Sequence, residues 1–490
     1  MENLVVATEK KLVLDDFLSQ VRIALNSPCK QILNVFAKVC LTSTECLGNV
    51  ASVTGKITVS VVYQNDEDLV DSAETIYDFV EKQRADFSLS DVFASDKISV
   101  ESINVSTNEI LCTVSHAVEV CGIYKYELPV ISNDENEFVL KKTTFDSLKL
   151  VSVSEDNFVV SEEVETNRSG LQVLSSKADV VLNDIACAVD KMVLEGKIVS
   201  EVVCLENGSI VQISKDFEFK QEISAENVVP NMVASSNICV KNITVTPEEK
   251  DDKTTLVFAI DLYSKNYTFD QVSYEIANDM FSIKNEIQTT YDFLTAKNNA
   301  GNSVGEDSCL IQADVSNIEG FDDMVGVFDA SAKVLAVAYQ EEKILVTVSY
   351  KAKAIYKTTL GMGSVDVFGE NVIEIENENK KQLKDFEILA SVSSFKVKAG
   401  KDLEVMLKSS YFAEFETVVE ESFVKSFEVQ GEKNQNGAGI KVYVARQGQT
   451  VFDVAKILNV QPEIITSQNQ VDDVFEQGEK IYVYSPANLA

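Results

Sequence analysis

The feature that most constrains the fold is the alternation of apolar and polar residues, which returns all along the chain. Residues 56–63, 98–105 and 343–350 show it clearly, and Val, Ile, Thr and Tyr are abundant in these runs. A period of two places one set of side chains on a core face and the other in water. Clusters of Asn, Asp, Gly and Glu separate the runs, as turns require. The sequence therefore predicts a mainly β protein.

Longer segments recur as well. Residues 55–57 (Gly-Lys-Ile) open a run that ends at Tyr63, and residues 196–198, again Gly-Lys-Ile, open a similar run that ends at Cys204. An acidic or Asn-Gly turn and a second run follow each of them. A weaker third copy begins near residue 343. This ordered recurrence favours three copies of one β-rich unit over chance similarity among hairpins.

Polar segments predict where the units end. Such segments occupy residues 161–170, 296–305 and 431–439, and the last of them is the clearest linker in the chain. We therefore expect a first unit at residues 1–165, a second at 166–300, a divergent third at 301–430, a linker at 431–440 and a terminal domain at 441–486.

Composition limits the partners. The 490 residues carry 43 Lys and Arg against 78 Asp and Glu, a formal charge of −35. This balance argues against nucleic acid or an anionic membrane as partner, because both bind through Lys and Arg. The chain is 45% apolar, so each unit can bury a core.

No residue pattern points to catalysis. The single histidine, His116, lies in an alternating run and is interpreted as a satisfied histidine of a strand. Residues 48–57 resemble a phosphate loop only superficially, because six residues separate the glycines where four are needed and Ile57 replaces the Ser or Thr that would hold magnesium. The nine cysteines are odd in number and lack C-x-x-C spacing, which indicates reduced, buried thiols. We expect no enzyme, no catalytic or metal-binding residues and no cofactor.

The chain begins without a basic segment followed by a long apolar one, which is the pattern of a signal peptide. No stretch approaches the roughly 18 apolar residues that a membrane span needs. We therefore expect a cytoplasmic protein without a membrane span.

The last residues follow a different pattern. Residues 441–445 and 480–484 read as short strands, and Thr450 with Asp453 comes close to a capping box at the start of a helix. Pro462 suits the first turn of a second helix. The predicted order is strand, helix, helix, strand.

This tail resembles a LysM module, through residues 443–455, 458–460, Pro462, Ile465, Asn469 and 478–481. The resemblance implies a groove for N-acetylglucosamine polymers between the loop before the first helix and the loop before the second strand. Two positions depart from the family, since Gln449 replaces an Asp and no Trp follows Thr450. Phe452 and Phe475 are the only aromatic residues near the loops, and we favour a packing role for both. The candidate groove residues are Gly448, Gln449, Thr450, Asn469, Gln470 and Val471.

The three preceding units resemble the SPOCS domain of spore-coat proteins. In the first unit the resemblance rests on residues 27–33, 37–39, 55–57, 61–63 and 76–79, and in the second on residues 196–203 and 216–217. Tandem SPOCS units followed by one LysM module resemble the SipL-type family of clostridial coat morphogenetic proteins.

The resemblance implies a role for the whole chain. Members of that family lie in the mother-cell cytoplasm at the forespore surface, where the LysM module engages the ATPase that forms the coat basement. The expected function is therefore a non-catalytic scaffold or adaptor in spore coat assembly, which docks to a protein through its LysM tail. The alternative is a protein that binds peptidoglycan glycans through the same module.

Overall fold

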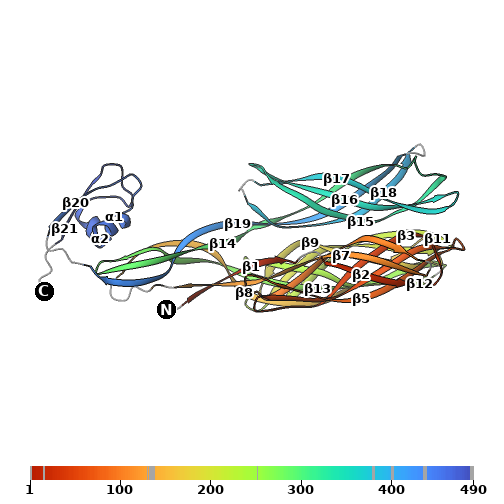
Figure 1. The fold of residues 1–490 in the computed structure, drawn as a ribbon, viewed down its shortest axis with the longest axis horizontal. Coiled ribbons are helices and arrows are strands. Elements are labelled where there is room, and N and C mark those ends of the chain that lie inside the picture. Colours follow the sequence, from red (N-terminus) through yellow and green to blue (C-terminus); the bar gives the residue numbers. More distant parts are fainter. Residues whose placement is uncertain are drawn as a thin grey trace.

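The computed structural model describes residues 3–14, 17–106, 108–129, 131, 138–250, 252–377, 381–398, 402–433 and 439–485. The protein is mainly β, as the alternation predicted: it has long antiparallel strands and two short helices near the C-terminus (Figure 1). In the described part of the chain, neither helix is long and apolar enough to cross a membrane.

The first unit consists of two antiparallel sheets. β7 lies in the middle of one sheet, with β6 on one side and β1 and β2 end to end on the other. β4 lies in the middle of the other sheet, between β3 and β5. The strands are β1 (Asn3–Val13), β2 (Phe17–Ala24), β3 (Cys29–Leu47), β4 (Val50–Asn65), β5 (Val70–Arg84), β6 (Ser90–Val105) and β7 (Glu109–Pro129).

Two more units repeat this strand order, except that in each of them one continuous strand takes the place of β1 and β2. In the second unit β13 is central between β8 and β12, and β10 is central between β9 and β11. Its strands are β8 (Phe138–Glu165), β9 (Gln172–Ala188), β10 (Lys191–Glu206), β11 (Ser209–Ser224), β12 (Val233–Lys250) and β13 (Lys253–Ser282).

The third unit pairs β19 with β14 and β18, and β16 with β15 and β17. It therefore has the topology of the second unit, although its sequence is the most divergent. Its strands are β14 (Asn285–Asp314), β15 (Phe321–Tyr339), β16 (Lys343–Thr358), β17 (Gly361–Glu376), β18 (Gln382–Lys398) and β19 (Asp402–Glu432).

The units begin earlier than the polar segments predicted. Residue 165 ends β8, which is the first strand of the second unit, and residue 300 lies inside β14 at a bulge between Asn299 and Asn302. The mistake has a physical cause: residues 161–163 and 165 are exposed on an edge strand, and an exposed strand can be as polar as a linker. The second unit passes into the third through a short turn between β13 and β14. Half of the predicted linker, residues 434–438, lies outside the described residues.

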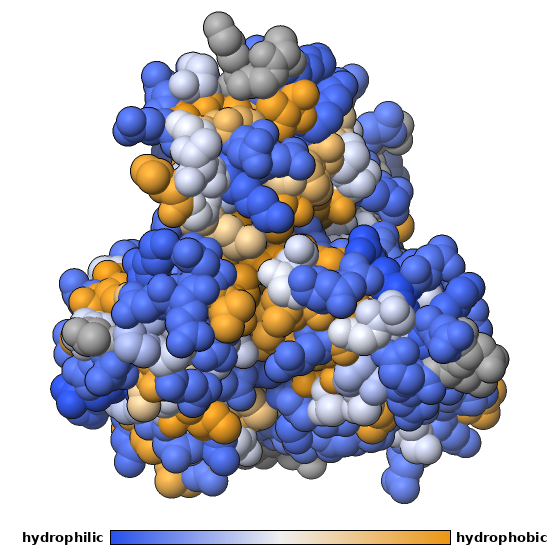
Figure 2. Space-filling model, turned by 90° about the vertical axis from the view of Figure 1, so that its right-hand side faces the viewer, coloured by the Kyte–Doolittle hydropathy of each residue, from blue (hydrophilic) through white to orange (hydrophobic). Residues whose placement is uncertain are grey.

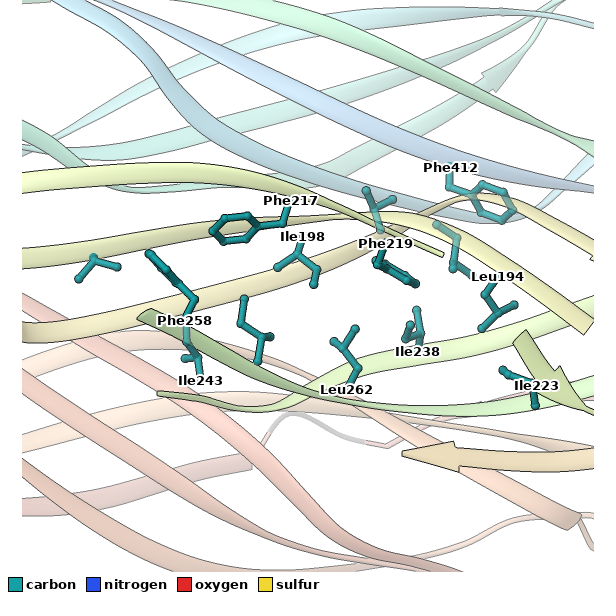
Figure 3. Close-up of a cluster of buried hydrophobic side chains, with 14 of the residues drawn as sticks. Leu194, Ile198, Phe217, Phe219, Ile223, Ile238, Ile243, Phe258, Leu262 and Phe412 are labelled. Atoms are coloured by element: carbon teal, nitrogen blue, oxygen red, sulfur yellow. The ribbon is translucent and has the colours of Figure 1, made fainter. Parts of the chain in front are cut away.

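Each unit buries a core between its two sheets. In the second unit Ile198, Phe217 and Phe258 meet across the sandwich, and the rings of Phe217 and Phe258 lie 5.1 Å apart (Figure 3). Burying such side chains stabilises a fold by about 1.5–3 kcal/mol each. The alternation in the sequence thus corresponds to inward-facing residues of two packed sheets.

The recurring Gly-Lys-Ile segment has a packing explanation. Gly55 lies directly opposite Phe79 in the sheet, and Gly196 lies opposite Phe219. A Cβ atom at Gly196 would lie 2.6 Å from the ring of Phe219 and 2.7 Å from the carbonyl oxygen of Val181. Glycine is therefore needed because the aromatic ring lies flat over the backbone of the neighbouring strand.

Two hydrophobic clusters join the three units into one body. One contains Leu33 of the first unit, Val203 of the second and Phe328 of the third, together with Phe36, Val62, Ile210, Ile355 and Met362. The other contains Val6 and Leu128, Phe145, Tyr274 and Ile276, and Leu294 and Phe423, again from all three units. Viewed along its long axis, the body shows three lobes with apolar residues between them (Figure 2).

The C-terminal module lies at the end of a stalk that strands β8, β13, β14 and β19 form beyond the body (Figure 1). It contains β20 (Gly439–Val444), α1 (Val451–Leu458), α2 (Pro462–Gln468) and β21 (Lys480–Ser485), in the strand, helix, helix, strand order. β20 and β21 form an antiparallel two-stranded sheet, and Val454, Ala455 and Ile465 of the helices are buried against it.

Candidate docking site on the C-terminal module

Helix α1 starts with a complete capping box. The backbone N–H of Asp453 donates to Oγ1 of Thr450 over 3.3 Å, and the backbone N–H of Thr450 donates to Oδ2 of Asp453 over 2.8 Å. Burial alone would raise the pKa of Asp453, but the bonds from Thr450 and the charge of Lys141 outweigh it and lower that pKa. The Thr450 hydroxyl is therefore part of the helix cap.

The loop at residues 448–450 lies beside residues 473–475. The N–H of Gly448 donates to the carbonyl of Phe475 over 3.0 Å, and the N–H of Phe475 donates to the carbonyl of Gln449 over 2.8 Å. The side-chain oxygen of Gln449 accepts from the N–H of Arg446 at 2.8 Å and from the hydroxyl of Tyr443 at 3.1 Å. The side-chain oxygen of Gln449 thus already has two donors within the module.

Asn469 in the second predicted loop also forms hydrogen bonds within the module. Nδ2 of Asn469 donates to the carbonyl of Tyr482 over 2.8 Å, and its Oδ1 accepts from the N–H of Tyr482 over 2.9 Å. Gln470 is exposed, and Val471 packs partly against the core of the module. Among the six residues that the sequence grouped as a groove, the side chains of Gln449 and Asn469 thus form hydrogen bonds that hold the module together.

The two aromatic residues near these loops are packing residues, as favoured from the sequence. Phe475 is 1% exposed and Phe452 is 9% exposed. Neither presents a face on which a sugar ring could stack.

One side of α1 is docked on the tip of the stalk. The ring of Phe452 packs edge-on against that of Phe281 at 5.4 Å, and Lys456 forms an ion pair with Asp279 at 2.7 Å. Nδ2 of Asn459 donates to the carbonyl of Ile283 over 2.9 Å. This contact was not predictable from the sequence, because Phe452 and Lys456 look like ordinary core and surface positions of an amphipathic helix. The contact fixes how the module is oriented on the stalk.

We expect Phe281→Ala to loosen the module without unfolding the body, because it removes the ring that packs against Phe452. Hydrogen exchange measured by mass spectrometry should become faster in residues 451–459 and in residues 279–283, and remain unchanged in β10. Phe293→Ala, which removes a 73% exposed ring from β14, serves as the control. Unchanged exchange in α1 would show that the docking contact does not hold the module.

The outward face of β20 and β21 is largely apolar, with Lys480 opposite Val444 at one end, and the described residues leave it uncovered. Ile440 is 72% exposed, Val442 56% and Val444 53%, while Tyr482 and Tyr484 of the neighbouring strand are 50% and 55% exposed. Ile440 lies directly opposite Tyr484, and Val442 lies opposite Tyr482. We call these five residues the outer face. The strands are apolar on both sides, which alternation alone cannot reveal, and the sequence reading therefore missed this face.

The two edges of this small sheet differ. The main-chain groups of Tyr482 and Tyr484 on the free edge of β21 are bonded to the side-chain amides of Asn469 and Gln468, including an N–H of Tyr484 that donates to Oε1 of Gln468 over 2.6 Å. These amides take the place of a further strand. β20 pairs with β21 alone in the described part of the chain.

A buried group of charges lies elsewhere, where the three units meet. Nζ of Lys384 donates to Glu9 over 2.7 Å, to Glu414 over 2.8 Å and to Oγ of Ser235 over 3.2 Å. We call Glu9, Ser235, Lys384 and Glu414 the central ion cluster. Two cavities beside it measure about 10 Å³ and about 40 Å³; the smaller is about the space of one water molecule. This arrangement is suited to joining the units.

His116 is packed, but the expectation of buried thiols holds for only four of the nine cysteines, Cys112, Cys121, Cys204 and Cys309, while the other five are half-buried. The imidazole of His116 is fully buried between the rings of Phe17 and Phe79, with Nε2 3.4 Å from Oγ of Ser19. Burial raises the pKa of Cys112 and Cys204 to about 11, which keeps both thiols protonated and unreactive at neutral pH. Among the described residues, no group of three His, Cys, Asp or Glu side chains could hold a metal ion.

Comparisons with known protein families, with curated proteins and with solved structures found no match for this chain.

Proposed function

We propose that the protein is a non-catalytic scaffold that docks to another protein through its C-terminal module. The observation that carries this proposal is the outer face, where five large apolar side chains lie uncovered on one small sheet. Uncovered apolar patches that lie together mark interaction surfaces more often than scattered apolar residues do. Two of the five are tyrosines, a residue type enriched where protein interfaces concentrate their binding energy.

The position of the module supports the same role. It lies at the end of the stalk, away from the three-lobed body, so that a partner can approach the outer face (Figure 1). The contacts of Phe452, Lys456 and Asn459 with the stalk use α1 and leave β20 and β21 free. The shared clusters of the three units give the module a rigid support.

The geometry favours a protein over a glycan as the ligand. Glycan recognition needs free polar groups or aromatic faces, and the predicted groove offers few of them, because Gln449 and Asn469 are engaged within the module and Phe452 and Phe475 are buried. The proposed setting comes from the family resemblance: the surface of the developing spore, with the ATPase of the coat basement as the partner. The proposal is thus an adaptor in spore coat assembly.

The test is a substitution at the centre of the outer face. Val442→Lys places a charge where apolar contact is expected, and we expect it to weaken binding of the full chain to purified coat-basement ATPase by about 30-fold, since a residue at the centre of an interface contributes about 2 kcal/mol. Biolayer interferometry measures the affinity. Val80→Lys, at a 57% exposed valine of β5, is the matched control and should leave binding unchanged.

Purified peptidoglycan separates the two kinds of ligand. We expect the full chain to remain in the supernatant when peptidoglycan is sedimented. Sedimentation with peptidoglycan, together with ATPase binding that Val442→Lys does not weaken, would contradict the docking role of the outer face.

A further inference from the structure

The second and third units meet where β10 and β11 approach β15, beside the cluster that contains Val203, Ile210 and Phe328. Glu201 of β10 lies at this meeting point. Both oxygens of its carboxylate accept from the backbone N–H of Asp329 on β15, at 3.0 and 3.1 Å. A carboxylate of one unit is therefore bonded to the main chain of another.

The N–H of Asp329 is directed at Glu201 because β15 is irregular at this point. The register of β15 with β16 shifts between Phe328 and Ser331, so Asp329 has no partner residue on β16. The φ of Asp329 is 52°, in the left-handed region. Such a bulge leaves main-chain groups without their ladder partner. The carboxylate of Glu201 takes the place of that partner.

Glu201 shares this place with two more carboxylates and one cation. Lys177 lies directly opposite Glu201 on β9, and its Nζ is 3.3 Å from Oδ2 of Asp179 and 3.4 Å from Oδ1 of Asp329. From β11 the uncharged Gln212 forms a hydrogen bond with Glu201. One lysine thus serves three carboxylates that come from β9, β10 and β15.

The first unit shows that the fold itself does not require a carboxylate at this position. Counted from Gly55 and Gly196 of the recurring segment, Ser60 of β4 occupies the place of Glu201. Ser60 is buried, and its hydroxyl donates to Glu74 of the same sheet. The ionisable group is therefore a feature of the second unit that the shared topology does not explain.

We propose that the contact between the second and third units is sensitive to pH, tight while Glu201 carries a proton and looser when Glu201 is charged. The charged form is half-buried beside the carboxylate of Asp329, and Lys177 is already shared by Asp179 and Asp329. A proton on Glu201 removes this repulsion and leaves an oxygen to accept from the N–H of Asp329. This inference goes beyond the docking role of the C-terminal module and does not depend on it.

The pH range follows from the surroundings of Glu201. Burial raises the pKa of Glu201 from 4.5 to about 7; the bond from the N–H of Asp329 opposes this rise, the charge of Asp329 adds to it, and Lys177 and Gln212 oppose it. Because the folded pKa is the higher one, the stability given by the proton is fully present below about pH 4.5 and is lost as the pH rises through about 7. Within this range, opening the contact becomes about tenfold more favourable per pH unit.

Urea unfolding of the full chain and of Glu201→Gln tests the proposal, because glutamine keeps the acceptor and resembles the protonated acid. We expect the unfolding constant of the parent chain, divided by that of the variant, to rise about tenfold per pH unit between roughly pH 5.5 and 6.5 and to level off above about pH 7.5. Glu226→Gln, at an exposed glutamate of the same unit, is the control and should give no such rise.

Hydrogen exchange measured by mass spectrometry locates the effect. When both chains are compared at about pH 8, where Glu201 is charged in the parent chain, residues 325–332 should exchange faster in the parent chain than in Glu201→Gln. Exchange in β4, which has Ser60 at the equivalent position, should be the same in both chains. Equal exchange at residues 325–332 would show that the charge does not loosen the contact.

Two neighbouring substitutions distinguish a titrating Glu201 from a merely structural one. The pH at which the ratio levels off should fall when both chains carry Asp329→Asn, because a negative charge is removed. It should rise when both carry Lys177→Met, because the cation is lost. Circular dichroism confirms that each variant is folded. A ratio that does not change with pH, or a levelling pH that Asp329→Asn does not lower, would overturn the proposal.

Discussion

Replacing Lys384 by methionine is expected to lower the free energy of unfolding by about 3–5 kcal/mol, because it removes the single cation that two buried carboxylates share. Lys384 lies on β18 of the third unit, whereas Glu9 lies on β1 of the first and Ser235 on β12 of the second. The substitution therefore weakens the contact between units. Urea unfolding followed by circular dichroism measures the loss in the free energy of unfolding. Lys343→Met removes an exposed ion pair with Glu374 and should cost less than about 1 kcal/mol.

The two carboxylates of the central ion cluster are expected to respond in opposite ways. Burial raises the pKa of both, but the charge of Lys384 and its hydrogen bond outweigh burial at Glu9, whose pKa is lowered, and do not at Glu414, whose pKa is raised. Glu9 therefore contributes stability at neutral pH that is lost as the pH falls through its folded pKa. Glu414 contributes in the opposite sense, and the stability it gives is lost as the pH rises through its folded pKa.

The opposite pKa shifts of Glu9 and Glu414 define a result that would contradict this account of the central ion cluster. Glu9→Gln should destabilise the protein at pH 7 clearly more than Glu414→Gln, since only Glu9 gains from being charged. Equal losses for the two variants would mean that the two carboxylates do not differ in this way, and a Lys384→Met variant as stable as the parent chain would mean that the cluster does not join the units.

Replacing Phe328 by alanine is the second large effect, with an expected loss of about 3–5 kcal/mol. The ring is fully buried in the cluster that includes Leu33 and Val203 of the other units, so the cavity left behind lies between units. Next to it, the carboxylate of Glu201 accepts from the N–H of Asp329 at 3.0 and 3.1 Å, which holds the backbone there and limits collapse into the cavity.

The measurement is again urea unfolding, with Phe368→Ala as control. Phe368 is 61% exposed on β17, and its loss should change stability by no more than about 0.5 kcal/mol. We expect the parent chain to unfold in one transition, because the units share two clusters. If Phe328→Ala left the stability unchanged, the three lobes would be independent domains connected in series.

The sequence predicted the β class and the elements of the C-terminal module well, because both depend on local periodicity. The runs at residues 56–63 and 343–350 lie in β4 and β16, and the cap at Thr450 starts α1. Contacts between distant segments were not predictable in this way. Lys384 pairs with Glu9, which lies 375 positions earlier in the chain, and nothing in the local pattern of either residue identifies the other.

The predicted groove shows the same limit of sequence patterns, because a polar residue type does not reveal which partner its side chain bonds. Gln449 and Asn469 are the residue types that bind ligands, and also those that close turns and cap strand edges. Only the bonds of Asn469 to Tyr482 show which use the chain makes of it. Exposed apolar residues such as Val442 and Ile440 are likewise indistinguishable from core residues until their surroundings are known.

The arrangement of three lobes in one chain has a consequence for stoichiometry. An assembly of three separate subunits with this shape would present three terminal modules, whereas this polypeptide presents one. If the module docks as proposed, the residues of the outer face give each molecule one docking site, and avidity arises when whole molecules come together. A layer built from such molecules would be sensitive to how densely they are deposited.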